Sequence, residues 1–113
     1  MSAPDPVFAN PHRGEVLLTL GQSQYRLRPS FQALAEAEET TGSLIALIER
    51  AGQGKIMIAD IAALLHACAK AGGHDVRFEV FSEEILRAGL AAVAVPTQQL
   101  LKAIMGGDGD ARE

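Results

Sequence analysis

Three residues of the types that bind soft metals, His66, Cys68 and His74, lie close together in the sequence. Zinc takes three or four ligands, which often occur as Cys-x-x-Cys or His-x-x-x-His pairs. His66 and Cys68 are two positions apart in a segment with helical periodicity, so their side chains point in nearly opposite directions. We therefore predict that the protein binds no metal and that Cys68 is a small core residue.

A second candidate is the glycine-rich segment Gly-Gln-Gly-Lys at residues 52–55, which faintly resembles a phosphate-binding loop. Such a loop needs a glycine five residues before the Gly-Lys pair and a serine or threonine after it. Glu49 and Ile56 occupy those two positions. The segment is therefore predicted to end a helix and begin a linker, with no nucleotide cofactor and no small-molecule substrate.

Catalytic groups are also poorly placed. Ser43 and Ser82 each precede a helical pattern as an N-cap residue does, and neither lies in a G-x-S-x-G elbow. The acidic pairs, Glu38 with Glu39 and Glu83 with Glu84, are adjacent in the sequence, so the two carboxylates of each pair diverge by about 100° on a helix. We predict that the protein is not an enzyme.

Charge and hydropathy limit the remaining classes. The formal net charge is −4 and the ten basic residues are scattered, whereas nucleic-acid binding needs clustered lysine and arginine. The sequence has no run of about 18 apolar residues and no basic N-terminal region followed by an apolar run. We expect a cytoplasmic protein that binds neither nucleic acid nor membrane.

The 113 residues fit one domain. Hydrophobic residues make up 48% of the chain but aromatic residues only 4%, so leucine, isoleucine, valine and alanine must build the core. Proline near the start and glycine near the end set the boundaries. We predict a flexible arm at residues 1–11, one globular domain at 12–105 and a disordered tail at 106–113.

Two alternating runs, at residues 15–20 and 24–28, flank a Gly-Gln-Ser turn and predict a β-hairpin. Its inner face consists of Val16, Leu18, Leu20, Tyr25 and Leu27. Its outer face consists of Glu15, Leu17, Thr19, Gln24, Arg26 and Arg28. An isolated hairpin is marginally stable in water, so the inner face is expected to pack on helices and at least one strand edge to stay open.

Helical periodicity predicts four to five short helices after the hairpin. The first begins at Phe31, with Phe31, Leu34 and Ala35 facing inward. The fourth follows an N-cap at Ser82, and the fifth begins at Pro96 or the next residue. Residues 74–80 are interpreted as an irregular connector, with a short strand as the alternative. The predicted fold is α+β, a single small domain with an N-terminal β-hairpin packed on four to five short helices.

This order of parts resembles a known family. The resemblance spans residues 9 to 105 and lies in three strings: Asn-Pro-His-Arg-Gly-Glu-Val at 10–16, Leu-Ala-Glu-Ala-Glu-Glu-Thr-Thr-Gly-Ser-Leu at 34–44 and Ile-Leu-Arg-Ala-Gly-Leu at 85–90. They are similar to the small tail proteins of gene transfer agents, the phage-like particles of alphaproteobacteria. That family is described as a tail-tube-associated component or as a tail assembly chaperone.

The resemblance implies a tail morphogenesis protein of a gene transfer agent or prophage that acts by protein–protein interaction. Its partners would be a tape-measure or tube protein, or a second copy of the chain, and it would occur in the cytoplasm or in a virion-like particle. The alternative is a cytoplasmic helical adaptor or regulatory protein unrelated to virions.

The partner-binding residues are predicted on and beside the outer face of the hairpin. They are Leu17, Thr19, Arg26 and Arg28 on the strands, with His12 and Arg13 just before them. Two alternatives stay open at this stage: His12 is a turn residue, and Leu17 is an ordinary exposed leucine. The apolar stripes of residues 85–105 are the next candidate surface.

Overall fold

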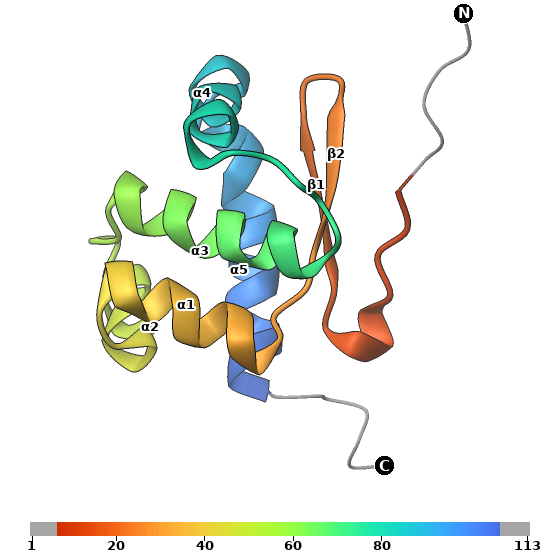
Figure 1. Ribbon diagram of the computed structural model, residues 1–113. Coiled ribbons are helices and arrows are strands. Elements are labelled where there is room, and N and C mark those ends of the chain that lie inside the picture. The colour runs from red at the N-terminus through yellow and green to blue at the C-terminus, as the bar shows by residue number, and fades with distance from the viewer. Residues whose placement is uncertain (1–6, 107–113) are drawn as a thin grey trace, which may run out of the picture.

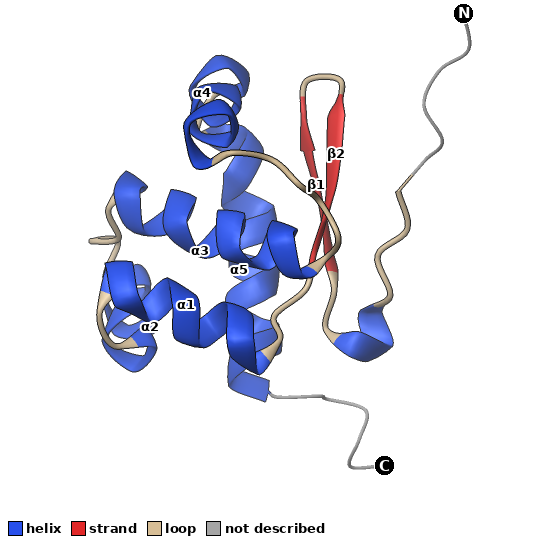
Figure 2. Ribbon diagram, in the orientation of Figure 1, coloured by secondary structure: helices blue, strands red, loops and turns tan. Residues whose placement is uncertain are grey.

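A β-hairpin leads into a body of helices in the computed structural model (Figure 1, Figure 2), which describes residues 7–106. The elements are a 3-10 turn (Pro11–Arg13), strands β1 (Val16–Leu20) and β2 (Ser23–Leu27), and helices α1 (Phe31–Thr41), α2 (Leu44–Gly52), α3 (Ile58–Ala71), α4 (Phe78–Ala88) and α5 (Ala91–Gly106). This confirms the predicted α+β class, with the hairpin first and five helices in the part of the chain described.

The two predicted terminal segments lie largely outside the described residues. Of the arm predicted at 1–11, the structure describes only residues 7–11, and Pro11 begins the 3-10 turn. Of the tail predicted at 106–113, it describes only Gly106, which ends α5.

A two-residue turn joins the strands, which pair antiparallel with Leu20 opposite Ser23. The predicted three-residue turn was therefore wrong, since Ser23 belongs to β2. Gly21 begins that turn with a φ of 63°, the left-handed value that a type II′ hairpin turn needs at its first position. The alternating apolar residues all face the helices, as predicted, and none is more than 7% exposed: Val16, Leu18, Leu20, Tyr25 and Leu27. The hairpin is also tied to α4, because Ser23 Oγ and the Tyr25 hydroxyl both donate hydrogen bonds to the Glu84 carboxylate.

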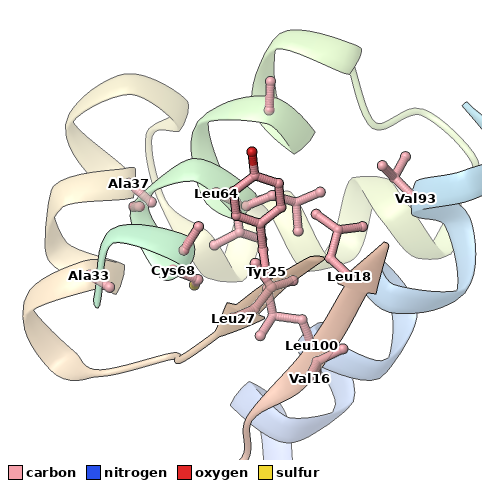
Figure 3. Packing of buried hydrophobic residues seen from close by; sticks show 14 of the residues in the cluster. Val16, Leu18, Tyr25, Leu27, Ala33, Ala37, Leu64, Cys68, Val93 and Leu100 are labelled. Atoms are coloured by element: carbon pink, nitrogen blue, oxygen red, sulfur yellow. The ribbon is translucent and has the colours of Figure 1, made fainter. Parts of the chain in front are cut away.

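Helix α3 is the centre of the core (Figure 3): α1 and β2 pack against it, while α5 packs against β1. Leu64, Leu65 and Cys68 of α3 are completely buried. The end of α3 comes very close to β2, since a Cβ placed on Gly72 would lie 1.9 Å from the carbonyl oxygen of Arg26. Glycine at this position therefore sets how closely the helix approaches the hairpin.

The predicted inward face of α1 was wrong at two of its three positions. Phe31 is 88% exposed and Ala35 is also exposed, whereas Ala33 and Ala37 are buried and Leu34 is partly buried. The buried face is thus rotated toward alanines spaced four apart. Small side chains at i and i+4 let the axes of α1 and α3 come close, and that packing decides the face more than side-chain size does.

The predicted starts of the last two helices were also wrong. Helix α4 begins at Phe78, so Ser82 lies inside it, and Arg77 takes the N-cap position without a side-chain hydrogen bond. Helix α5 begins at Ala91 and carries Pro96 in its interior. In both cases an apolar residue that precedes the predicted start, Phe81 in α4 and Val93 in α5, is buried in the core. The gain from burying that residue outweighs the local cap and proline signals.

The connector between α3 and α4 agrees with the favoured interpretation over most of its length. Residues 74–77 have no regular structure, and no strand forms there. Residues 78–80 are the first turn of α4 instead.

Candidate interaction surface

The edge of β1 presents unpaired backbone groups. Because Leu20 and Ser23 flank a two-residue turn, they form a hydrogen-bonded pair, and the pairing then alternates along the ladder. Leu17 and Thr19 therefore point their N–H and C=O groups away from β2. Within residues 7–106, no hydrogen bond reaches these backbone groups. We call them the open edge of β1.

The edge of β2, by contrast, is closed by other parts of the chain. The N–H of Arg26 donates to Nε2 of His74 over 2.8 Å, and the N–H of Arg28 donates to the carbonyl oxygen of Cys68 over 2.9 Å. Gln24 Oε1 accepts a hydrogen bond of 3.2 Å from the N–H of Val7. Arg26 and Arg28 are therefore occupied, and among residues 7–106 only the outward backbone groups of Gln24 are left on β2, too few for a further strand, whereas β1 can accept one.

Glu15 was predicted to face solvent, and this was wrong. Glu15 is only 8% exposed, and its carboxylate lies 3.8 Å from Nε of Arg26 and 3.7 Å from Nε of Arg28. The same carboxylate accepts a hydrogen bond of 2.8 Å from the N–H of Asn10. Glu15 precedes β1, and Gly14 turns the chain there with a φ of 74°, so the side chain lies against the arginines.

Arg26, one of the predicted partner-binding residues, already has several contacts within the chain. Its Nε donates a hydrogen bond of 2.6 Å to the carbonyl oxygen of Phe8, and its Nη1 donates one of 2.9 Å to that of Gly72. The side chain thus joins residues before β1 to the end of α3. A structural role accounts for its position.

The other predicted contact residues lie at the surface. Leu17 is 39% exposed, Thr19 is exposed and Arg28 is half-buried. His12 and Arg13 are exposed within the 3-10 turn, where Asn10 Oδ1 accepts a hydrogen bond of 2.9 Å from the N–H of His12. His12 therefore occupies the turn position that was the open alternative.

Most of these residues line one of two hollows in the surface. A groove of about 530 Å³, which we call the edge groove, runs between the start of β1 and the second half of α5, with Val16, Leu17, Gln99, Lys102 and Ala103 among its lining residues. A second hollow, of about 520 Å³, lies beside residues 8–11 and contains Arg13, Glu15, Arg26 and Arg28. The structure thus separates Leu17 from the arginines, and Thr19 lines neither hollow.

The three soft-metal residues each have another partner or are buried. His66 Nε2 lies 2.6 Å from the carbonyl oxygen of Val76, and His74 Nε2 accepts from Arg26. Burial raises the pKa of the Cys68 thiol to about 12, which keeps it protonated. Among residues 7–106, no group of three His, Cys, Asp or Glu side chains is placed to hold a metal ion.

Burial also shifts the pKa values of two other groups, Tyr25 and His74. Burial, followed by the hydrogen bond to Glu84, raises the pKa of Tyr25 to about 12, so its hydroxyl stays a donor. Burial, followed by the positive charge of Arg26, lowers the pKa of His74 from its usual 6.5. Both shifts favour the neutral forms on which the contacts of β2 depend.

No single described helix is long and apolar enough to cross a membrane. Helices α4 and α5 meet that requirement only when taken together, and the pair is bent by 117°.

Sequence reasoning missed the closure of β2 by His74 and the contribution of Lys102 to the edge groove. No local sequence pattern predicts either contact. The packing of α3 on β2 brings His74, and the packing of α5 on β1 brings Lys102, from distant parts of the chain. Such contacts follow from tertiary packing, which spacing along the sequence does not report.

The fold and this surface define a small α+β protein with an open strand edge on β1 and a groove beside it. The chain belongs to the family described as "Phage tail tube protein, GTA-gp10", which matches it over residues 13–107. This confirms the predicted resemblance to gene transfer agent tail proteins and places the chain in a family of phage-like tail morphogenesis. No curated protein and no solved structure matches it.

Proposed function

We propose that this protein is a tail assembly chaperone of a gene transfer agent or prophage. In this role it binds a tape-measure or tube protein during tail construction and leaves before the tail is complete. The observation that carries the proposal is the difference between the two strand edges, of which only that of β1 is open in the described part of the chain.

Subunits that build a ring or tube through strand addition need two complementary edges, because such contacts run head to tail. Here His74 and Cys68 occupy the β2 edge. Strand addition at β1 therefore stops after one partner. A single acceptor edge supports a stoichiometric binder more than it supports a repeating tube subunit.

A tail-tube component is the second candidate, and the family's own description favours it. Such a subunit would have to use helical surfaces for at least one of its contacts. Exposed apolar side chains are available for this on the last two helices, among them Leu86, Val95 and Met105. The alternative of an adaptor unrelated to virions has no support from the family.

The proposal assigns the chain no catalysis. Partner binding occurs in the cytoplasm, where tails assemble. His74 Nε2 and the Tyr25 hydroxyl already serve the hairpin, and His66 Nε2 lies against the carbonyl oxygen of Val76.

Deletion of the gene, followed by complementation, tests the role in tail morphogenesis. In the deletion strain we expect capsids that carry no tails, and after complementation we expect normal tails. Normal tails in the deletion strain would contradict both candidates. The amount of this chain in finished particles then separates the chaperone from the tube component.

A further inference from the structure

We propose that the edge groove binds an extended, acidic segment of a partner protein, which pairs with β1 as a third strand. This inference rests on the proposed function in that it identifies the partner-binding site and the chemistry of its ligand. It is carried by the backbone of β1, the side chains of α5 and the charges around the groove.

The backbone offers a short window for pairing. Leu17 and Thr19 present two N–H and two C=O groups outward. The window ends on one side at Glu15, whose N–H already donates to the carbonyl oxygen of Asn10 over 3.1 Å, and on the other at the turn that begins with Gly21. A bound segment therefore makes its main-chain hydrogen bonds over about three residues, as in strand addition to an exposed sheet edge.

Helix α5 supplies the floor beneath this third strand. Gln99, Lys102 and Ala103 line the groove together with Leu17. The chain just before β1 lies close to the helix, because a Cβ placed on Gly14 would lie 3.6 Å from Cβ of Ala103. Alternate side chains of an added strand point toward α5, so the ligand needs a small or medium apolar residue opposite Ala103.

The charge that the groove leaves unpaired is positive. Lys102 is exposed and makes no ion pair with any residue of 7–106, whereas Glu15 is already paired with Arg26 and Arg28. An aspartate or glutamate in the bound segment would pair with Lys102 without competition from Glu15. This complementarity favours an acidic ligand.

A second copy of the chain fits the groove poorly. Two-fold pairing of β1 with β1 would place both α5 helices on the same face of the joined sheet, under strands that are about 4.8 Å apart. Helix axes need about 8–10 Å. The sequences at the chain's own ends also do not suit strand addition: Pro4 and Pro6 have no N–H to donate to a ladder, and residues 107–110 alternate glycine and aspartate, which are depleted in strands.

The test uses a randomised library of 12-residue peptides, selected by mRNA display on the full-length chain, with enriched peptides resynthesised for fluorescence anisotropy. We expect enriched peptides to carry an acidic residue and alternating apolar residues. Thr19→Pro removes one outward N–H and no core side chain, and it should lower peptide affinity about tenfold, the loss of one hydrogen bond. Gln24→Pro is the matched control, because Gln24 is the register partner of Thr19 and its N–H also points outward. Its affinity should stay within about twofold of wild type.

A second pair of variants tests the charge. Lys102→Glu should lower affinity about tenfold, while Lys55→Glu, the same change at an exposed lysine between α2 and α3, should leave it within about twofold. Hydrogen exchange on the wild-type chain adds a measurement that needs no variant: bound peptide should slow exchange at the N–H groups of Leu17 and Thr19.

Failure to enrich any peptide would overturn the inference, as would equal binding by Thr19→Pro and Gln24→Pro or unchanged exchange at Leu17 and Thr19. The proposed function can fail independently. A chain that binds such peptides but is dispensable for tails would contradict the assembly role alone, and a chain that tails require but whose groove binds no peptide would contradict the groove alone.

Discussion

The N–H of Arg26 in β2 donates its hydrogen bond to Nε2 of His74, 48 residues further along the chain. A ring nitrogen accepts a hydrogen bond only when it carries no proton, so this contact requires neutral His74. The Tyr25 ring, 5.2 Å from the imidazole, and the guanidinium of Arg26 surround the group, and burial with that charge lowers the pKa of His74. The closed edge of β2 therefore depends on the protonation state of one histidine.

Stability should fall when the medium becomes acidic. Since the folded pKa of His74 lies below the usual 6.5, the folded state binds fewer protons than the unfolded state. Its contribution is fully present above pH 6.5 and is lost as pH falls through the folded pKa. Urea unfolding between pH 5 and pH 8 measures this. His74→Gln keeps an acceptor that does not titrate, so it should flatten the slope; an unchanged slope would contradict the assignment.

Gly72→Ala should destabilise the fold by about 1–3 kcal/mol. The added Cβ would lie 1.9 Å from the Arg26 carbonyl oxygen, which is backbone and cannot rotate away. Gly52→Ala is the control, because no atom lies within 4 Å of its Cβ position and alanine favours the helix that Gly52 ends. Thermal unfolding of both variants compares them, and equal melting temperatures would contradict the close approach of α3 to β2.

The same substitution should unfold the domain at one leucine of β1 and leave it folded at the adjacent leucine. Leu18 is fully buried, so Leu18→Asp places an unpaired charge in the core and should unfold the domain. Leu17 is 39% exposed, so Leu17→Asp should change the free energy of unfolding by only about 0.5 kcal/mol while weakening binding at the edge groove. Circular dichroism and anisotropy measure the two effects. A folded Leu18→Asp variant would mean that the register of β1 differs from that described.

Glu15→Gln should cost about 1 kcal/mol, a value reduced because both arginines remain partly exposed to solvent. The control is Glu83→Gln, which removes a surface pair with Arg87 on α4 and should have almost no effect. Denaturant unfolding at low and high salt separates the two. If the variants were equally stable, Glu15 would not organise the start of the hairpin.

The inner face of the hairpin could be predicted because it alternates strictly. The predicted Gly-Gln-Ser turn was one residue too long, because Ser23 pairs with Leu20 and belongs to β2. Helices α4 and α5 could be located but not bounded, since Phe81 and Val93 extend each helix ahead of the Ser82 and Pro96 signals. The buried face of α1 differs from the predicted one because large apolar residues are expected to be buried, whereas the small residues Ala33 and Ala37 are buried on the helix that packs against α3.

The candidate site could likewise be predicted only in part. Leu17 and Thr19 were predicted from alternation alone, which assigns residues to a face. Glu15 and Arg26 were assigned to solvent for the same reason, yet residues 8–10 and Gly72 lie against them. Alternation gives the direction of a side chain but not what the rest of the chain places over it.

The central claim is that this protein assists tail assembly without becoming part of the tube. Quantitative mass spectrometry of purified, tailed particles tests it most directly, with the family's tube role as the competing outcome. The chaperone account predicts that the chain is present in lysates during assembly but absent, or far below one copy per particle, in finished particles. A constant, stoichiometric number of copies in finished tails would contradict it.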